Sequence, residues 1–169
     1  MRTPIFFSML VLTALACRGA TGPDGNANVV SGTFSLGPDA YANGFWFFPV
    51  DGGNQGTPAK VATVDVPELS EAVVDGGAVL VYVRIPSGPT MEPDEWSLLP
   101  FHQGGFGGGY LVSIKAAVEV GRIRIGYVHE ATSATVPPNV YQASLPRYEF
   151  RWVAIGGPSR TVTPDDIVH

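Results

Sequence analysis

The chain contains a single cysteine, Cys17, so no disulfide bond can form within it. It is also poor in basic residues: ten lysines and arginines stand against 15 aspartates and glutamates, which gives a formal net charge of −5. Proteins that bind nucleic acid carry excess positive charge, so this composition predicts no nucleic-acid partner. The apolar content of 45% is too high for a chain that is disordered throughout.

The N-terminus has the three parts of a secretory signal peptide. Arg2 supplies a positive charge, residues 5–15 are almost entirely apolar, and small residues follow up to Ala16. The apolar run is too short to cross a bilayer, for which a helix needs about 20 residues. Cys17 comes directly after it, and an isolated cysteine at this position is typical of lipid attachment. We therefore expect residues 1–16 to be cleaved off as a signal peptide and Cys17 to be lipidated.

A lipid on Cys17 determines where the protein would act. Several acyl chains, each contributing about 0.8 kcal/mol per buried CH₂ group, would hold the chain stably to a membrane. The next residue is Arg18 and not the aspartate that retains many lipoproteins at the inner membrane. The sequence therefore predicts an exported protein, lipid-anchored to the cell envelope, with the outer membrane favoured over the inner one.

The residues from Cys17 onward divide into a tether, one domain and a tail. Residues 17–28 hold the cysteine and three Gly-X-Y triplets, which are too few for a collagen triple helix and predict a tether. Residues 29–157 are long enough for a single domain with its own core. Residues 158–169 are predicted to be a C-terminal tail.

Alternating apolar and polar side chains, the pattern of half-buried strands, recur along the domain. The composition, with 21 glycines and 15 prolines, favours short strands and many turns. On the last strand Tyr148, Phe150 and Trp152 share one face, which we predict to lie in the core. The predicted strands are residues 30–36, 41–48, 61–66, 78–85, 111–116, 122–127 and 147–154.

One segment, residues 67–74, is predicted to be helical. Pro67 suits the first turn of a helix, two carboxylates follow it, and Gly76 and Gly77 stop the helix. Because polar and apolar side chains alternate, each predicted strand has one face towards solvent and one towards the core. This pattern is typical of antiparallel sheets. The predicted fold class is all-β: an antiparallel β-sandwich of about seven strands with one short connecting helix. A small closed barrel is the alternative.

The stretch from Val66 to Val83, VPELSEAVVDGGAVLVYV, resembles a motif in a family of small bacterial lipoproteins. Those proteins have a collagen-like Gly-X-Y stretch after the lipidated cysteine and a β-sandwich domain. Three further segments match in the expected order: GPDGNANV at 22–29, WSLLPF at 96–101 and YEFRWVAI at 148–155. The triplet region is shorter here than is usual in the family. The family has no assigned function, so the resemblance implies lipidation and the β-domain but no catalytic residue.

No motif for catalysis or for a cofactor stands out. The serines lack a Gly-x-Ser-x-Gly elbow, and the glycine-rich residues 104–109 lack the Lys-Ser/Thr that completes a phosphate loop. The three histidines show no metal-site spacing, so no metal is predicted. A site built from His102, His129 and either Glu92 or Asp94 is the alternative. We therefore expect a protein that is not an enzyme and needs no cofactor.

The sequence predicts a non-catalytic interaction or envelope-associated module whose partner is a glycan or an envelope protein. A carbohydrate-binding β-sandwich is the alternative, and a hydrolase without a recognisable motif is third. The candidate ligand contacts are Trp96, Phe101, His102, Phe106 and Tyr110, with Trp46 as a further aromatic for sugar stacking.

The outer faces of the predicted strands also carry four arginines together with Glu149. Such residues favour a solvated surface paired across strands over a single anion-attracting patch. The four are Arg122, Arg124, Arg147 and Arg151.

Overall fold

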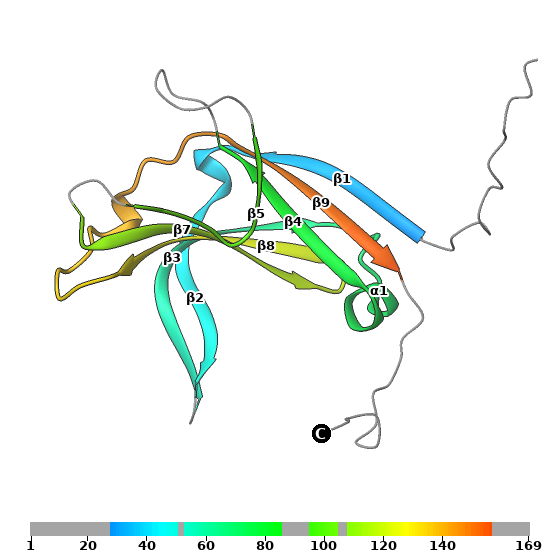
Figure 1. Cartoon of the computed structure of the whole chain (residues 1–169), viewed down its shortest axis with the longest axis horizontal. Coiled ribbons are helices and arrows are strands. Elements are labelled where there is room, and N and C mark those ends of the chain that lie inside the picture. Colours follow the sequence, from blue (N-terminus) through cyan, green and yellow to red (C-terminus); the bar gives the residue numbers. More distant parts are fainter. Residues whose placement is uncertain (1–27, 51–52, 86–94, 105–107, 157–169) are drawn as a thin grey trace, which may run out of the picture.

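The alternating segments form two antiparallel β-sheets that pack face to face (Figure 1). This computed structural model describes residues 28–50, 53–85, 95–104 and 108–156. The predicted signal peptide, the tether up to residue 27 and the C-terminal tail lie outside these ranges, as do Cys17 and Phe106. Both sheets are open and have edge strands, so the fold is the predicted β-sandwich and the barrel alternative is wrong.

The strands of each sheet are joined by antiparallel ladders. The first sheet has the order β1-β9-β4-β5, made of β1 (Asn28–Leu36), β9 (Tyr148–Gly156), β4 (Ala78–Arg84) and β5 (Trp96–Leu98). The second has the order β2-β3-β8-β7-β6, made of β2 (Ala42–Val50), β3 (Gly53–Asp65), β8 (Arg122–Ala131), β7 (Tyr110–Glu119) and β6 (Phe101–Gly104). Two short 3₁₀ turns, η1 (Pro38–Ala40) and η2 (Val140–Gln142), precede β2 and β9.

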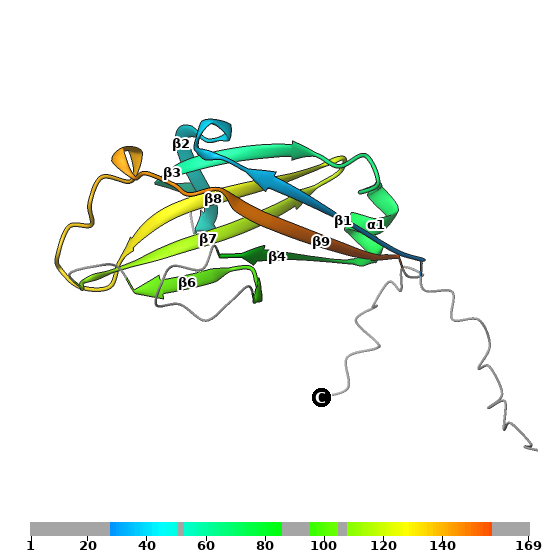
Figure 2. The same ribbon diagram turned by 90° about the horizontal axis from the view of Figure 1, so that it is seen from above.

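The core lies between the two sheets and is built from alternate side chains of their facing strands. Phe150 of one sheet and Ile123 of the other are both fully buried. Tyr148 and Trp152, the neighbours of Phe150 on the same face of β9, are 7% and 5% exposed. The predicted inner face of this strand is therefore confirmed. Seen from above in Figure 2, β1 and β9 pass over β8, whose inward side chains supply part of the opposite half of the core.

The structure has nine strands in the described ranges, where alternation predicts about seven. The two additional strands, β5 and β6, are three and four residues long, too short to show a period of two. β3 is 13 residues long and begins at Gly53, well before its predicted start at residue 61. The other predicted strands occur within a few residues of their expected bounds.

The one α-helix among the described residues, α1 (Glu71–Gly76), connects β3 to β4 but begins later than predicted. The backbone before it is bonded to the β7–β8 turn: Val66 N–H donates to the Gly121 carbonyl, and Gly121 N–H donates to the Leu69 carbonyl. Because these bonds hold Leu69 in the core, the segment starting at Pro67 cannot join the helix. No helix in the described ranges is long and apolar enough to span a membrane.

The β2–β3 hairpin extends beyond the sandwich as a two-stranded arm. β3 pairs with β8 only from Ala59 to Asp65, whereas its pairing with β2 continues to Gly53. Among the described residues, no third strand therefore pairs with residues 53–58 of β3. Figure 1 shows this hairpin reaching away from the other strands. We call residues 45–50 and 53–58 the aromatic arm.

Candidate functional site

The structure distributes the predicted contact residues over several surfaces. Trp96 lies on the outer face of the four-stranded sheet, and His102 lies on the outer face of the five-stranded sheet. Phe101 turns inward and packs against the core. Tyr110 also faces inward, with its ring 5.2 Å from that of His129, and Phe106 lies outside the described residues. The described members therefore do not form one site.

The two described histidines lie on opposite faces of the same sheet. His102 pairs with Ser113, whereas His129 pairs with Val112, the adjacent residue on β7. Because successive side chains of a strand point to opposite faces, one imidazole points outward and the other inward. The alternative metal site built on both histidines is therefore wrong. Within the described ranges no three histidine, cysteine or acidic side chains gather closely enough to hold a metal ion.

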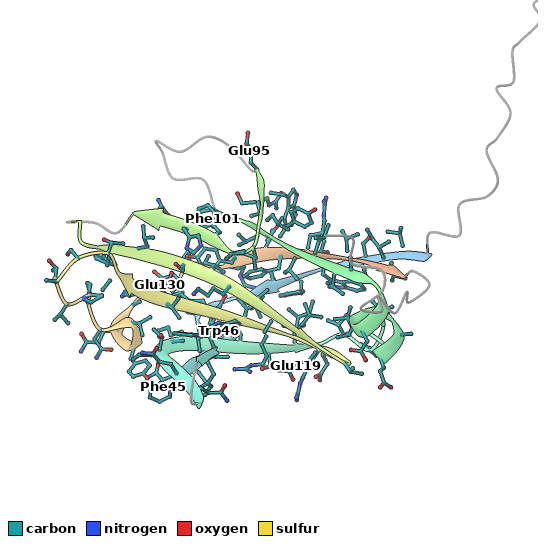
Figure 3. The ribbon with its side chains drawn as sticks, turned by 60° about the horizontal axis from the view of Figure 1, so that its bottom comes forward. Phe45, Trp46, Glu95, Phe101, Glu119 and Glu130 are labelled. Carbon is teal, nitrogen blue, oxygen red and sulfur yellow. The ribbon has the colours of Figure 1, made fainter. Side chains whose placement is uncertain are left out.

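A polar cluster surrounds His102 on the outer face of the five-stranded sheet. Nδ1 of His102 is 2.7 Å from Oγ of Ser113, which in turn donates a hydrogen bond to Glu130. Lys115 forms an ion pair with the other carboxylate oxygen of Glu130. The four side chains come from three adjacent strands, β6, β7 and β8. Figure 3 shows Glu130 within this face, away from Glu119 near the far end of β7.

The charge of Glu130 is fixed by these neighbours. Partial burial of the carboxyl is the largest single influence and acts to raise its pKa, whereas the hydrogen bonds from Lys115 and Ser113 act to lower it. The positive charges of Lys115 and, when protonated, His102 act in the same direction. The net result is a pKa for Glu130 below its ordinary value, so the carboxylate is ionised at neutral pH.

This cluster has the residue types of a hydrolase but not the required arrangement. A nucleophilic serine gives its proton to histidine, and the histidine is oriented by an acid. Here the Ser113 hydroxyl donates its hydrogen bond to Glu130 and not to His102, so its oxygen accepts a hydrogen bond from Nδ1 of His102. Ser113 is also fully buried, out of reach of a substrate. The chain of hydrogen bonds therefore orients His102 and does not activate Ser113.

The outer face of the four-stranded sheet presents a tryptophan close to two arginines. The guanidinium carbons of Arg151 and Arg84 lie 4.5 and 5.5 Å from the centre of the Trp96 ring. Arg84 is also ion-paired with Glu149. A hollow of about 360 Å³ beside this group is lined by Thr33, Phe34, Ser35, Trp96 and Glu149. The face therefore combines an aromatic ring, hydroxyl groups and charges of both signs.

The outer-face arginines belong to two separate surfaces. Arg122 and Arg124 lie on the five-stranded sheet and both pair with Glu119, at 2.5 and 3.6 Å. The hydrogen bond from Arg122 to Glu119 lowers the pKa of that carboxyl despite some opposing burial. Arg151 lies on β9 of the other sheet, and Arg147 directly precedes β9 and donates a hydrogen bond to Ser35 of β1. One anion-attracting patch made of all four is therefore excluded, and the pair at Glu119 matches the solvated, paired surface.

The aromatic arm carries the most exposed aromatic side chains of the described residues. Phe45, Phe47 and Phe48 are 49%, 57% and 36% exposed. The rings of Phe45 and Phe47 lie 6.1 Å apart on one face of β2 and rest on Gly56, where a Cβ would come within 2.9 Å of the Phe47 ring. Figure 3 shows Phe45 at the protruding hairpin, on the side away from Glu95.

The candidate contacts chosen from the sequence omit these phenylalanines, Arg84 and Ser113. The run of aromatic residues at 41–48 is visible in the sequence, but an uncharged aromatic run ordinarily predicts a buried strand, so it does not indicate the exposure of Phe45 and Phe47. The sequence gives no signal for Arg84 and Ser113 either, because their partners are set by strand register.

The comparisons with known proteins give no family for this fold. No protein-family model, no curated protein and no solved structure matches the chain.

Proposed function

We propose that the protein is a non-catalytic binding module, exported and held to the cell envelope by a lipid on Cys17, that grips a partner protein through its aromatic arm. The observation that carries the proposal is the exposure of Phe45 and Phe47 on a hairpin that projects from the sandwich. The signal peptide pattern and the lone cysteine support the location.

Exposure of the aromatic arm to water is unfavourable in free energy. A two-stranded hairpin is marginally stable unless a further strand or surface packs on it. Burying a phenylalanine fully contributes about 1.5–3 kcal/mol, and roughly half of that is still available from Phe47, which is 57% exposed. A partner that covers the arm would gain this free energy from several rings at once. An apolar, protruding element of this kind is typical of protein–protein contact.

The open edge of β2 specifies the form of the partner. β2 is an edge strand of the five-stranded sheet, so one row of its backbone groups has no ladder partner among the described residues. Neither Ala42–Val50 nor residues 53–59 contain Lys, Arg, Asp or Glu, the charged side chains that often protect such edges. The one proline of β2, Pro49, stands near the end of the strand, so residues 42–48 all keep a backbone N–H. We infer that the partner supplies an extended, apolar strand that adds to β2 by main-chain hydrogen bonds.

Site-specific photo-crosslinking tests this proposal. A photoreactive phenylalanine analogue is placed at position 47 of the full chain, in the cells that naturally make it. We expect one adduct of defined mass with another protein. The matched control places the analogue at Val120, which is 56% exposed but lies in the turn at the opposite end of the sheet, and should give no adduct.

Three results would contradict the proposal. They are the absence of an adduct at position 47, an equal adduct at position 120, and an adduct that is a second copy of this chain. A second variant guards against incidental capture: Phe45→Ser should reduce the yield at position 47 severalfold while leaving the melting temperature nearly unchanged, because Phe45 is half exposed.

Carbohydrate binding is the second candidate function. The observation that favours it is the indole of Trp96, held on the outer face of the four-stranded sheet beside a hollow lined by hydroxyl groups. It uses a different sheet from the arm, so the two functions are compatible.

A further inference from the structure

The outer face of the four-stranded sheet is organised in rows of side chains that run across all four strands. The strand registers align Ser35, Glu149, Arg84 and Trp96 in one row. The same registers align Thr33, Arg151, Tyr82 and Leu98 in the next row. Both rows point away from the core, because their chain neighbours Phe150 and Val83 are fully buried on the other face.

Trp96 lies on this surface close to Arg84 and Arg151. The guanidinium carbon of Arg151 is 4.5 Å from the centre of the Trp96 ring, a cation–π distance. Arg84 is already neutralised by its ion pair with Glu149. Arg151, by contrast, has no carboxylate within salt-bridge distance in the described ranges. One positive charge is therefore held in place beside the indole and remains available to a ligand.

The hollow beside Trp96 supplies the other contacts. It measures about 360 Å³, within the range of small-ligand pockets, and its lining includes the hydroxyls of Thr33 and Ser35 and the carboxylate of Glu149. Hydroxyls and a carboxylate exchange hydrogen bonds with sugar hydroxyl groups, and an indole packs against the C–H surface of a sugar ring. The hollow therefore offers both kinds of contact that a single sugar unit makes with a protein: hydrogen bonds to its hydroxyl groups and packing against its ring.

The net positive charge of this face favours acidic sugars over neutral ones. Arg84, Arg147 and Arg151 stand against Glu149, so this surface is net positive on a chain of net charge −5. Arg147 adds to the positive end, where its guanidinium lies 3.4 Å from Oγ of Ser35. Guanidinium groups bind carboxylates through two parallel hydrogen bonds. Glu95, the acidic residue next to Trp96, points away from the domain in Figure 3.

We propose that this face binds a saccharide whose sugar ring carries a carboxylate, with Trp96 against the ring, Thr33, Ser35 and Glu149 at its hydroxyl groups, and Arg151 at the carboxylate. The site lies on a different sheet from the aromatic arm and does not depend on the partner of the arm. It names a ligand class for the second candidate function.

Titration calorimetry on the full chain at low salt tests this site with two probes, tri-galacturonic acid and neutral galactotriose. We expect the acidic sugar to bind about tenfold more tightly or better, as a charge-assisted pair of hydrogen bonds predicts. Arg151→Gln should reduce the affinity for the acidic sugar to that for the neutral one. The control is Arg122→Gln, which makes the same charge change on the other sheet and should leave both affinities unchanged.

Equal affinity for the two sugars, or no heat from either at millimolar concentration, would overturn the proposal. An equal loss in Arg122→Gln and Arg151→Gln would also overturn it, because general charge and not this site would then be responsible. Trp96→Ala should abolish binding of both sugars. Should that variant unfold, Trp96→Phe serves instead: it should weaken both sugars severalfold but keep the preference for the acid, and unchanged binding would remove Trp96 from the site.

Discussion

The indole of Trp46 lies against Gly126, on the strand beyond its own neighbour. A Cβ added at Gly126 would come within 2.2 Å of the indole ring atom Cε3. The ring therefore reaches from β2 across β3 to β8, and it packs the part of the aromatic arm nearest the sandwich against β8. The guanidinium of Arg124, 5.6 Å from the ring centre, lies on the same outer face.

Substitution of Gly126 should therefore displace the arm. Gly126→Ala forces Trp46 out of its place, and we expect it to lower the free energy of unfolding by about 1–3 kcal/mol, the usual cost of overpacking. Urea unfolding followed by tryptophan fluorescence measures both the loss and the changed surroundings of the indole. Gly104→Ala is the control, because nothing lies within 4 Å of a Cβ there, and its effect should stay within about 0.5 kcal/mol. Equal losses of stability in Gly126→Ala and Gly104→Ala would mean that the indole of Trp46 leaves room for a Cβ at Gly126.

The core prediction concerns Trp152, which is 5% exposed and packs over Gly32 of β1. Trp152→Ala removes this ring from the centre of the four-stranded sheet and should lower the free energy of unfolding by about 3–5 kcal/mol. Val120→Ala, at a residue 56% exposed, is the comparison and should change stability by less than about 0.5 kcal/mol. Urea titrations of both variants give the two values, and a small effect at Trp152 would contradict the packing described for β9.

The pH prediction concerns Glu130, whose pKa in the folded protein lies below its ordinary value. A lowered folded pKa stabilises the protein at pH values above the unfolded pKa, and this stability is lost as the pH falls through the folded pKa. Glu130→Gln should therefore cost more stability near neutral pH than at acidic pH well below about 4. Unfolding free energies of both chains across this range test the difference. Glu68→Gln, which makes the same change at an exposed residue, is the control and should change stability at neutral pH by less than about 0.5 kcal/mol.

The export prediction concerns Cys17, which lies outside the described residues. Cys17→Ala should prevent acylation and move the protein from the membrane fraction to the soluble exported fraction. Labelling with a fatty acid and fractionation after a high-salt wash measure both effects, and Thr21→Ala in the same segment should change neither. A Cys17→Ala chain that still pellets with the membranes would show that something other than a lipid holds it there.

The sequence predicts the fold class because alternation of side chains is local to each strand. The inner face of β9, with Phe150 fully buried, follows from period two alone. Contacts between strands are harder to predict. Arg84 and Glu149 are 65 residues apart, and whether they meet depends on the register of β4 on β9, which the packing of both sheets determines. A one-residue shift would point one of them into the core.

The exposure of the arm illustrates the same limit. The aromatic run at 41–48 can be seen in the sequence, and a dense aromatic strand ordinarily predicts core. Phe45 and Phe47 are exposed because β8 ends its pairing with β3 at Ala59, and no feature of β2 itself encodes where β8 stops. The helix start depends likewise on distant backbone bonds to Gly121.

The pairing of β1 with β9 has a mechanical consequence. Asn28, where the predicted tether would join the domain, is the first residue of a ladder of nine residue pairs that ends at Leu36. In an antiparallel ladder the hydrogen bonds lie perpendicular to the strands. Tension that enters at Asn28 along β1, as between an anchored membrane and a held partner, therefore loads these bonds together and not one after another. A lipid-anchored chain would thus be pulled in shear, the direction in which a β-ladder resists rupture best.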